Sequence, residues 1–184
     1  MMKIKVTDLK KQLKAYDQKE LIDLVVEMFK ANKDVQNYLS SKFLGDEVNE
    51  ELFKKARKKI ENKFFPDRGF GKLRLAEAKK EITAFKKATN DEKRTVDLML
   101  FYVEQGVEFT NSFGDINEGF YVSLVRMFDQ VAVECDRNEV LYREFSSRLS
   151  RVVSKAQGTG WGFEEALSEI YYSIDWVHDE DDDE

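Results

Sequence analysis

The stretch FFPDRGFGKL at 64–73 contains residue types that could bind a phosphate group. A phosphate-binding P-loop needs the pattern G-x-x-x-x-G-K-[ST], because its backbone N–H groups surround the phosphates and its hydroxyl holds magnesium. Pro66 stands where the first glycine is required, and Leu73 stands where the hydroxyl is required. The sequence therefore excludes a P-loop at this position.

A simpler anion site is compatible with the same stretch. The N–H groups at a helix N-terminus attract anions, and Arg68, Lys72 and Arg74 would add positive charge beside them. The composition is also typical of a plain turn between two helices, with Pro66 and Gly69 changing the direction of the chain. We expect the turn, and a site for a small anion or nucleotide is the alternative.

A polar break, FTNSFGDINEGFY at 109–121, is the second candidate site. It is not a calcium-binding EF-hand loop, because Phe120 stands where a glycine is needed and Arg126 where a glutamate is needed. We expect Asp115 and Glu118 to cap the helix that follows. The alternative is a small polar pocket, closed by a residue of a second glycine-rich break, and its candidate residues are Thr110, Asn111, Asp115, Asn117, Tyr121 and Trp161.

Residues for familiar catalysis or metal binding are scarce. The only histidine, His178, lies next to the acidic C-terminus, and the only cysteine, Cys135, stands alone. Nucleophilic catalysis and zinc binding need several such groups together. Glu104 and Glu108 are one helical turn apart, and we expect them to be a solvated pair. The sequence therefore favours a protein that is not an enzyme and that uses no cofactor or metal.

Basic residues are concentrated between residues 54 and 87. In FKKARKKIEN at 53–62 the Lys and Arg side chains surround an apolar stripe, as on an exposed helix face. A basic patch of this extent could also bind nucleic acid. The sequence pI near 5.1 opposes this, because an acidic protein repels phosphates. We expect a solvated face, and nucleic-acid binding is a further alternative.

Charge divides the chain into two unlike halves. Residues 1–90 carry 22 Lys and Arg against 14 Asp and Glu, whereas residues 91–184 carry 8 against 22. The last six residues, 179–184, are all acidic, and we expect them to form a disordered tail. Opposite charge on two parts of one molecule can attract a partner or a second copy. We therefore expect a protein–protein interaction or structural role, with self-association as one form of it.

The elements that carry these residues are expected to be helices. Apolar residues recur at spacings of three and four almost throughout, and the 184 residues include one proline. This pattern predicts an all-α fold of about eight or nine helices, packed as antiparallel hairpins in a bundle or a short superhelical stack. We expect one domain over residues 1–178, with a possible subdivision near Pro66 to Gly71. The helix after Thr89 is apolar on most sides, which predicts a central position.

Several helix boundaries are indicated by local signals. Asp17 and Glu20 have the spacing of a capping box. Asp46 or Asn49 could cap the helix that begins after Gly45. Pro66 is expected to end that helix, because a residue before proline is driven away from helical geometry.

The sequence also bears on localisation. The longest apolar run, LMLFYV at 98–103, is far below the roughly 20 residues that cross a bilayer. The first 14 residues are charged and lack the apolar segment of a signal peptide. We expect a cytoplasmic protein without membrane contact.

Four stretches, taken together and in this order, resemble a bacterial family that is classed as a domain of unknown function. They are VTDLKKQLKAYDQKELIDLV at 6–25, FFPDRGFGKLRLAEAKKEI at 64–82, YVEQGVEFTNSFGDINEGFY at 102–121 and GTGWGFEEAL at 158–167. The resemblance spans nearly the whole chain. It implies a single bacterial, cytoplasmic, all-helical domain, and it implies no particular activity or site residue.

Overall fold

The structure, a computed structural model, describes residues 3–66 and 73–181. This part of the chain contains ten α-helices and no strand, which confirms the prediction of an all-α fold. In chain order the helices are α1 (Val6–Leu13), α2 (Gln18–Ala31), α3 (Lys33–Leu44), α4 (Asp46–Phe64), α5 (Leu75–Thr89), α6 (Glu92–Phe113), α7 (Glu118–Asp136), α8 (Glu139–Lys155), α9 (Phe163–Tyr172) and α10 (Asp175–Asp181). None of these helices combines the length and the hydropathy needed to cross a membrane.

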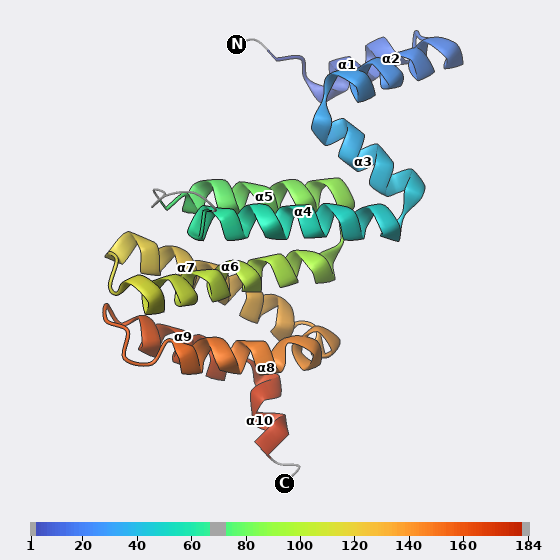
Figure 1. Cartoon of the computed structure of the whole chain (residues 1–184). Coiled ribbons are helices and arrows are strands. Elements are labelled where there is room, and N and C mark those ends of the chain that lie inside the picture. Colours follow the sequence, from blue (N-terminus) through green and yellow to red (C-terminus); the bar gives the residue numbers. More distant parts are fainter. Residues whose placement is uncertain (1–2, 67–72, 182–184) are drawn as a thin grey trace.

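The helices from α4 to α9 form antiparallel pairs that stack in chain order (Figure 1). The pairs are α4 with α5, α6 with α7, and α8 with α9, and α6 contacts both α4 and α8. The connections between successive helices from α5 to α9 are two to seven residues long, and helices joined by so few residues favour antiparallel packing. The result is a layered stack.

The hydrophobic core is continuous from α4 to α10. Helix α6 lies at its centre and buries residues on every side, including Val96, Leu98 and Leu100. Gly106 allows α7 to approach closely, because a Cβ atom at this position would overlap the side chain of Leu124. The central position predicted for this helix is thus observed.

Two of the four predicted helix-boundary signals are observed. Asp17 and Glu20 form the predicted capping box, with each side chain accepting a hydrogen bond of 2.8 Å from the backbone N–H of the other. Helix α4 ends before Pro66, as predicted. The prediction that Asp46 or Asn49 caps α4 is wrong, because Gly45, with φ of 75°, occupies that position.

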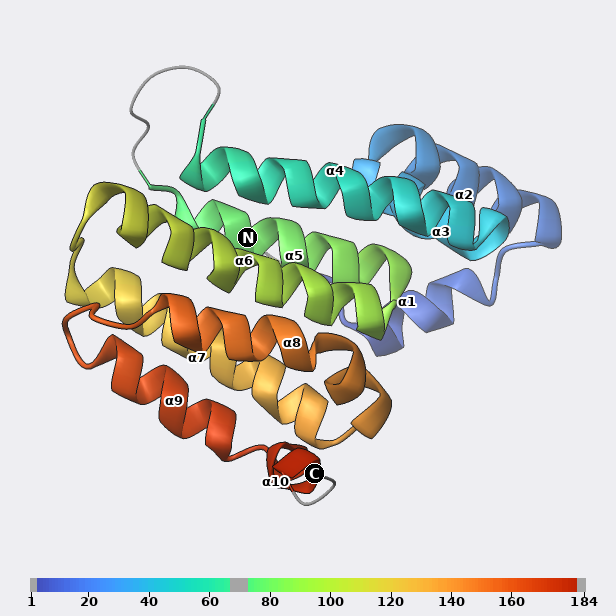
Figure 2. The same cartoon turned by 60° about the horizontal axis from the view of Figure 1, so that its bottom comes forward.

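The first two helices form an arm that lies outside the core. We define the N-terminal arm as residues 6–31, which comprise α1 and α2. Neither helix has a buried residue, and the main packing contact of α2 is with α3 (Figure 2). Helix α3 in turn packs on α4 and α5. The arm therefore extends from one end of the stack.

The acidic run at the C-terminus begins inside a helix. Helix α10 extends to Asp181, so the first three residues of the run have helical backbone. Residues 182–184 lie outside the described part of the chain, and their disorder stays a prediction.

Candidate functional site

The candidate anion site at the glycine-containing stretch is only partly described. Arg68 and Lys72 lie outside the described residues, so the site stays a prediction. Arg74 immediately precedes α5, and its Nη1 lies 3.7 Å from Oε2 of Glu77. The same carboxylate accepts a 2.6 Å hydrogen bond from Nζ of Lys63, which lowers the pKa of Glu77. A negative charge therefore already lies beside Arg74.

Three of the residues proposed for a polar pocket come together between α6 and α7. The Tyr121 hydroxyl lies 2.7 Å from Oγ1 of Thr110 and donates a 3.1 Å hydrogen bond to Oδ1 of Asp115. Asp115 also approaches the second glycine-rich break, since a Cβ at Gly160 would lie 3.2 Å from Oδ2 of Asp115. These contacts connect two loops at one end of the stack.

The other three residues of that candidate pocket have separate environments. Asn117 caps α7 by accepting a 3.0 Å hydrogen bond from the Phe120 N–H, so the prediction that Asp115 and Glu118 form this cap is wrong. Asn111 donates a 2.9 Å hydrogen bond to the backbone carbonyl of Lys155 at the end of α8. Trp161 is 61% exposed. A ligand pocket here stays a prediction, and the observed contacts account for the polar groups structurally.

An ion-pair network that the sequence did not indicate joins α6 and α8. Arg148 donates two hydrogen bonds to Glu104, of 2.7 and 2.8 Å, and a third of 2.8 Å to Asp97. Arg57 of α4 lies 3.3 Å from the same Asp97 oxygen and stacks on Phe101, at 3.7 Å from the ring centroid. Glu104 is therefore not part of a solvated pair, and that prediction is wrong for this residue.

The network stabilises the arginine as a cation. Burial acts to lower the pKa of Arg148, but the hydrogen bonds to Glu104 and the charge of Asp97 raise it overall. Because each carboxylate is engaged by an arginine, this cluster resembles a structural tie between layers. A bidentate pair of this kind also fixes side-chain geometry.

The thiol of the single cysteine is unreactive in the folded protein. Cys135 is fully buried in α7. Burial, assisted by the charge of Glu134, raises the pKa of its thiol to about 12. The thiolate needed for nucleophilic attack is therefore essentially absent at neutral pH. Across the described residues, no three His, Cys, Asp or Glu side chains gather in a way that would hold a metal ion.

The basic region at 54–87 is interleaved with acids. Helices α4 and α5 pack side by side, and their lysines pair both within α4 and across the two helices. The pairs are Lys54 with Glu50, Lys55 with Glu51, Lys58 with Glu61, Lys59 with Glu81, and Lys63 with Glu77. Each acid reduces the positive potential that would attract phosphates. Nucleic-acid binding stays a prediction that this arrangement does not favour.

Helix α2 has an exposed apolar surface. Its apolar residues recur at spacings of three and four and form one face, and the stack does not cover this face. Five of its large apolar side chains are between 39% and 54% exposed, namely Ile22, Val25, Val26, Met28 and Phe29. Contiguous exposed apolar residues of this kind mark interaction surfaces in soluble proteins.

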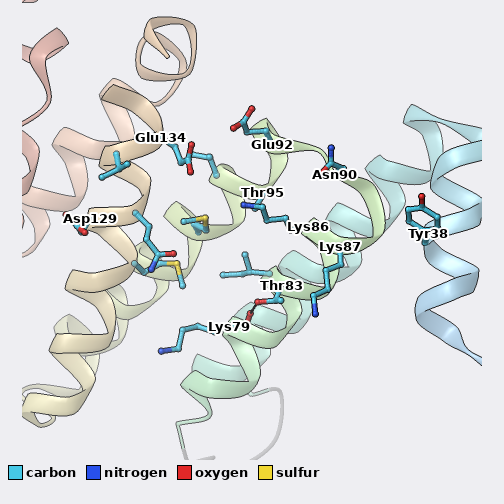
Figure 3. Close-up of a pocket in the computed structure, with 16 residues that line it drawn as sticks. Tyr38, Lys79, Thr83, Lys86, Lys87, Asn90, Glu92, Thr95, Asp129 and Glu134 are labelled. Atoms are coloured by element: carbon cyan, nitrogen blue, oxygen red, sulfur yellow. Dashed lines mark hydrogen bonds between the residues drawn. The ribbon is translucent and has the colours of Figure 1, made fainter. Parts of the chain in front are cut away.

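A groove of about 920 Å³ lies between α5 and α7, with α6 beneath it (Figure 3). We call it the α5–α7 groove. Its apolar lining residues are Ile82, Val96, Met99, Met127 and Val133. Lys79, Lys86 and Lys87 line its α5 side, and Asp129 and Glu134 line its α7 side. In Figure 3 the side chains of Lys79 and Lys86 extend toward α7, whereas Lys87 lies on the side of α5 away from it. No sequence motif indicated this groove, because three separate helices form it.

One family model matches both the N-terminal arm and the stack. The model of a family of unknown function, DUF6155, matches residues 4–175. The chain belongs to the DUF6155 family. A comparison with curated proteins and with solved structures finds no match. Because the DUF6155 match begins at residue 4, the N-terminal arm is part of the family domain and not an extension added to it.

Proposed function

We propose that this chain is a cytoplasmic, non-enzymatic protein that binds another protein chain through the exposed face of α2. The observation that carries the proposal is the row of large apolar side chains on α2 that the stack leaves uncovered. An amphipathic helix that presents such a face is suited to lie in an apolar groove of a partner. Burial of its side chains would contribute roughly 25 cal/mol for each Å² of apolar area removed from water.

Three further observations support binding rather than catalysis. The Cys135 thiol is buried and protonated, and Glu104 and Asp97 are engaged by Arg148. The Tyr121 hydroxyl on α7 donates a hydrogen bond to Asp115 in the connection between α6 and α7. The titratable groups that could do chemistry thus have structural partners or lie in the core.

Affinity capture with a pair of matched variants tests the proposal. Val25→Ser/Val26→Ser removes two exposed valines from α2, and Val122→Ser/Val140→Ser removes two exposed valines from the stack as the control. We expect the native chain and the control to retain the same proteins from a nuclease-treated host lysate. The α2 variant should recover about tenfold less of them, because apolar contacts at the centre of an interface carry most of its affinity.

Two results would contradict the proposal. One is equal recovery of the same proteins by all three forms. The other is recovery that depends on omitting the nuclease, which would favour the nucleic-acid alternative.

A further inference from the structure

We infer that the α5–α7 groove receives α2 from a second copy of the chain, so that two copies exchange arms. The inference rests on the proposed function, because it names the partner of the same apolar face. It is carried by the correspondence between the charges that flank this face and the charges that flank the groove.

The apolar face of α2 has a basic edge and an acidic edge. At 100° per residue, the large apolar side chains of α2 cover an arc of about 200°, with Leu24 at one end and Val26 at the other. Lys19 and Lys30 lie about 20° and 40° beyond the Val26 end, with Asp23 at about 60°, and Glu20 and Glu27 lie about 40° and 60° beyond the Leu24 end. The helix therefore presents an apolar surface between opposite charges.

The groove has the complementary arrangement. Lys79 and Lys86 of α5 stand along one side, and Asp129 and Glu134 of α7 stand along the other (Figure 3). A helix laid along the groove would place its basic edge against the acids of α7 and its acidic edge against the lysines of α5. Opposite charges on the two edges favour one of the two possible directions of α2 in the groove.

The lengths of the two surfaces also agree. Ile22 and Phe29 are seven residues apart, as are Lys79 and Lys86. At a rise of 1.5 Å per residue each separation is about 10 Å along its helix axis. The exposed face of α2 therefore matches the lysine-flanked length of the groove.

The arm of the same chain is held away from its own groove. One residue, Asn32, separates α2 from α3, and its side chain caps α3 by accepting hydrogen bonds from the N–H groups of Asp34 and Val35. Helix α3 packs on α5, and its Tyr38 stands at the edge of the groove (Figure 3). Bringing α2 into this groove would require breaking that cap and the α2–α3 contact.

Reciprocal exchange gives a closed dimer. If each copy inserts α2 into the groove of the other, the apolar faces of both α2 helices are covered and the same contact occurs twice. Such a two-fold arrangement closes on itself and needs no further copies.

Charge reversal and mixing test the exchange directly. Lys19→Glu/Lys30→Glu makes the basic edge of α2 acidic, and Asp129→Lys/Glu134→Lys makes the acidic side of the groove basic. Sedimentation velocity over a range of concentrations should show dimers for the native chain. For each variant alone, the dissociation constant of the dimer should rise about tenfold or more, because like charges then face each other at both contacts.

An equimolar mixture of the two variants should recover the dimer. In the mixed dimer one contact has both charges reversed and the other has both charges native, so neither contact places like charges together. Val25→Ser/Val26→Ser leaves the groove intact and should be monomeric wherever the native chain is dimeric. Circular dichroism shows whether each variant is folded. If a charge variant does not fold, the test of the exchange rests on the Val25→Ser/Val26→Ser variant.

Several outcomes would overturn the inference. A native chain that stays monomeric at all concentrations would do so, as would a mixture that associates no better than its components. If the native chain is monomeric and Val25→Ser/Val26→Ser still loses captured proteins, the partner is a different protein and the proposed function stands without the exchange. If neither capture nor self-association depends on α2, both proposals fail.

Discussion

Replacing Phe128 with alanine should lower the free energy of unfolding by about 3–5 kcal/mol. Phe128 lies on α7 and is fully buried in the core between the layers. Its removal leaves a cavity that the surrounding helices fill only in part, so the lost burial is compounded by lost contacts. Urea denaturation followed by circular dichroism measures the change.

The same substitution at Phe43 is the matched control. Phe43 lies on α3 and is 75% exposed, so its loss should change the free energy of unfolding by less than about 0.5 kcal/mol. Comparable losses at the two positions would show that the Phe43 side chain is packed into the core, contrary to its exposure in the structure. The two substitutions therefore compare a buried position in the stack with an exposed position on α3.

Replacing Arg148 with methionine should lower the free energy of unfolding by about 3 kcal/mol. The substitution keeps an apolar stem of similar length but leaves Glu104 and Asp97, each largely shielded from water, without their shared cation. Arg57 still reaches Asp97, whereas the bidentate partner of Glu104 is lost. Urea denaturation at neutral pH measures the effect.

Two companion variants identify the origin of that loss. Arg143→Met is the control, because Arg143 lies on the same helix but is highly exposed, and its pair with Glu139 should be worth less than about 1 kcal/mol. Glu104→Gln combined with Arg148→Met should cost clearly less than the sum of the two single changes, since both remove the same interaction. Strict additivity would show that the Arg148–Glu104 pair contributes nothing measurable.

Local features of the fold could be predicted because their causes lie close together in the sequence. The capping box of Asp17 and Glu20 involves residues three apart. The end of α4 depends on Pro66, and the central position of α6 depends on how many sides of one helix are apolar. Each of these signals can be interpreted without knowledge of the tertiary structure.

Contacts between distant residues could not be predicted in this way. Glu104 looked solvated because its partner, Arg148, is 44 residues further along the chain. Asp115 was expected to cap the following helix, but that helix begins at Glu118 and is capped by Asn117, so Asp115 instead accepts a hydrogen bond from the Tyr121 hydroxyl. The first error came from a distant partner and the second from a helix start placed two residues too early.

The exposed face of α2 was hidden from sequence analysis for a different reason. An amphipathic helix has the same spacing of apolar residues whether it faces its own core or another chain. Only the packing of α3 on α4 and α5, with α2 beyond it, shows that this face is left uncovered. The α5–α7 groove was equally hidden, because its lining comes from three helices.

Hydrogen exchange at low and high protein concentration tests the central claim most directly, namely that α2 is covered by the groove of a second copy. Peptides that cover residues 18–31 and 79–99 report on the two surfaces. We expect both to exchange more slowly at high concentration, with the same dependence on concentration as the sedimenting mass. Exchange in residues 18–31 that is independent of concentration would contradict the claim, and so would slowing that is confined to the arm while the groove is unchanged.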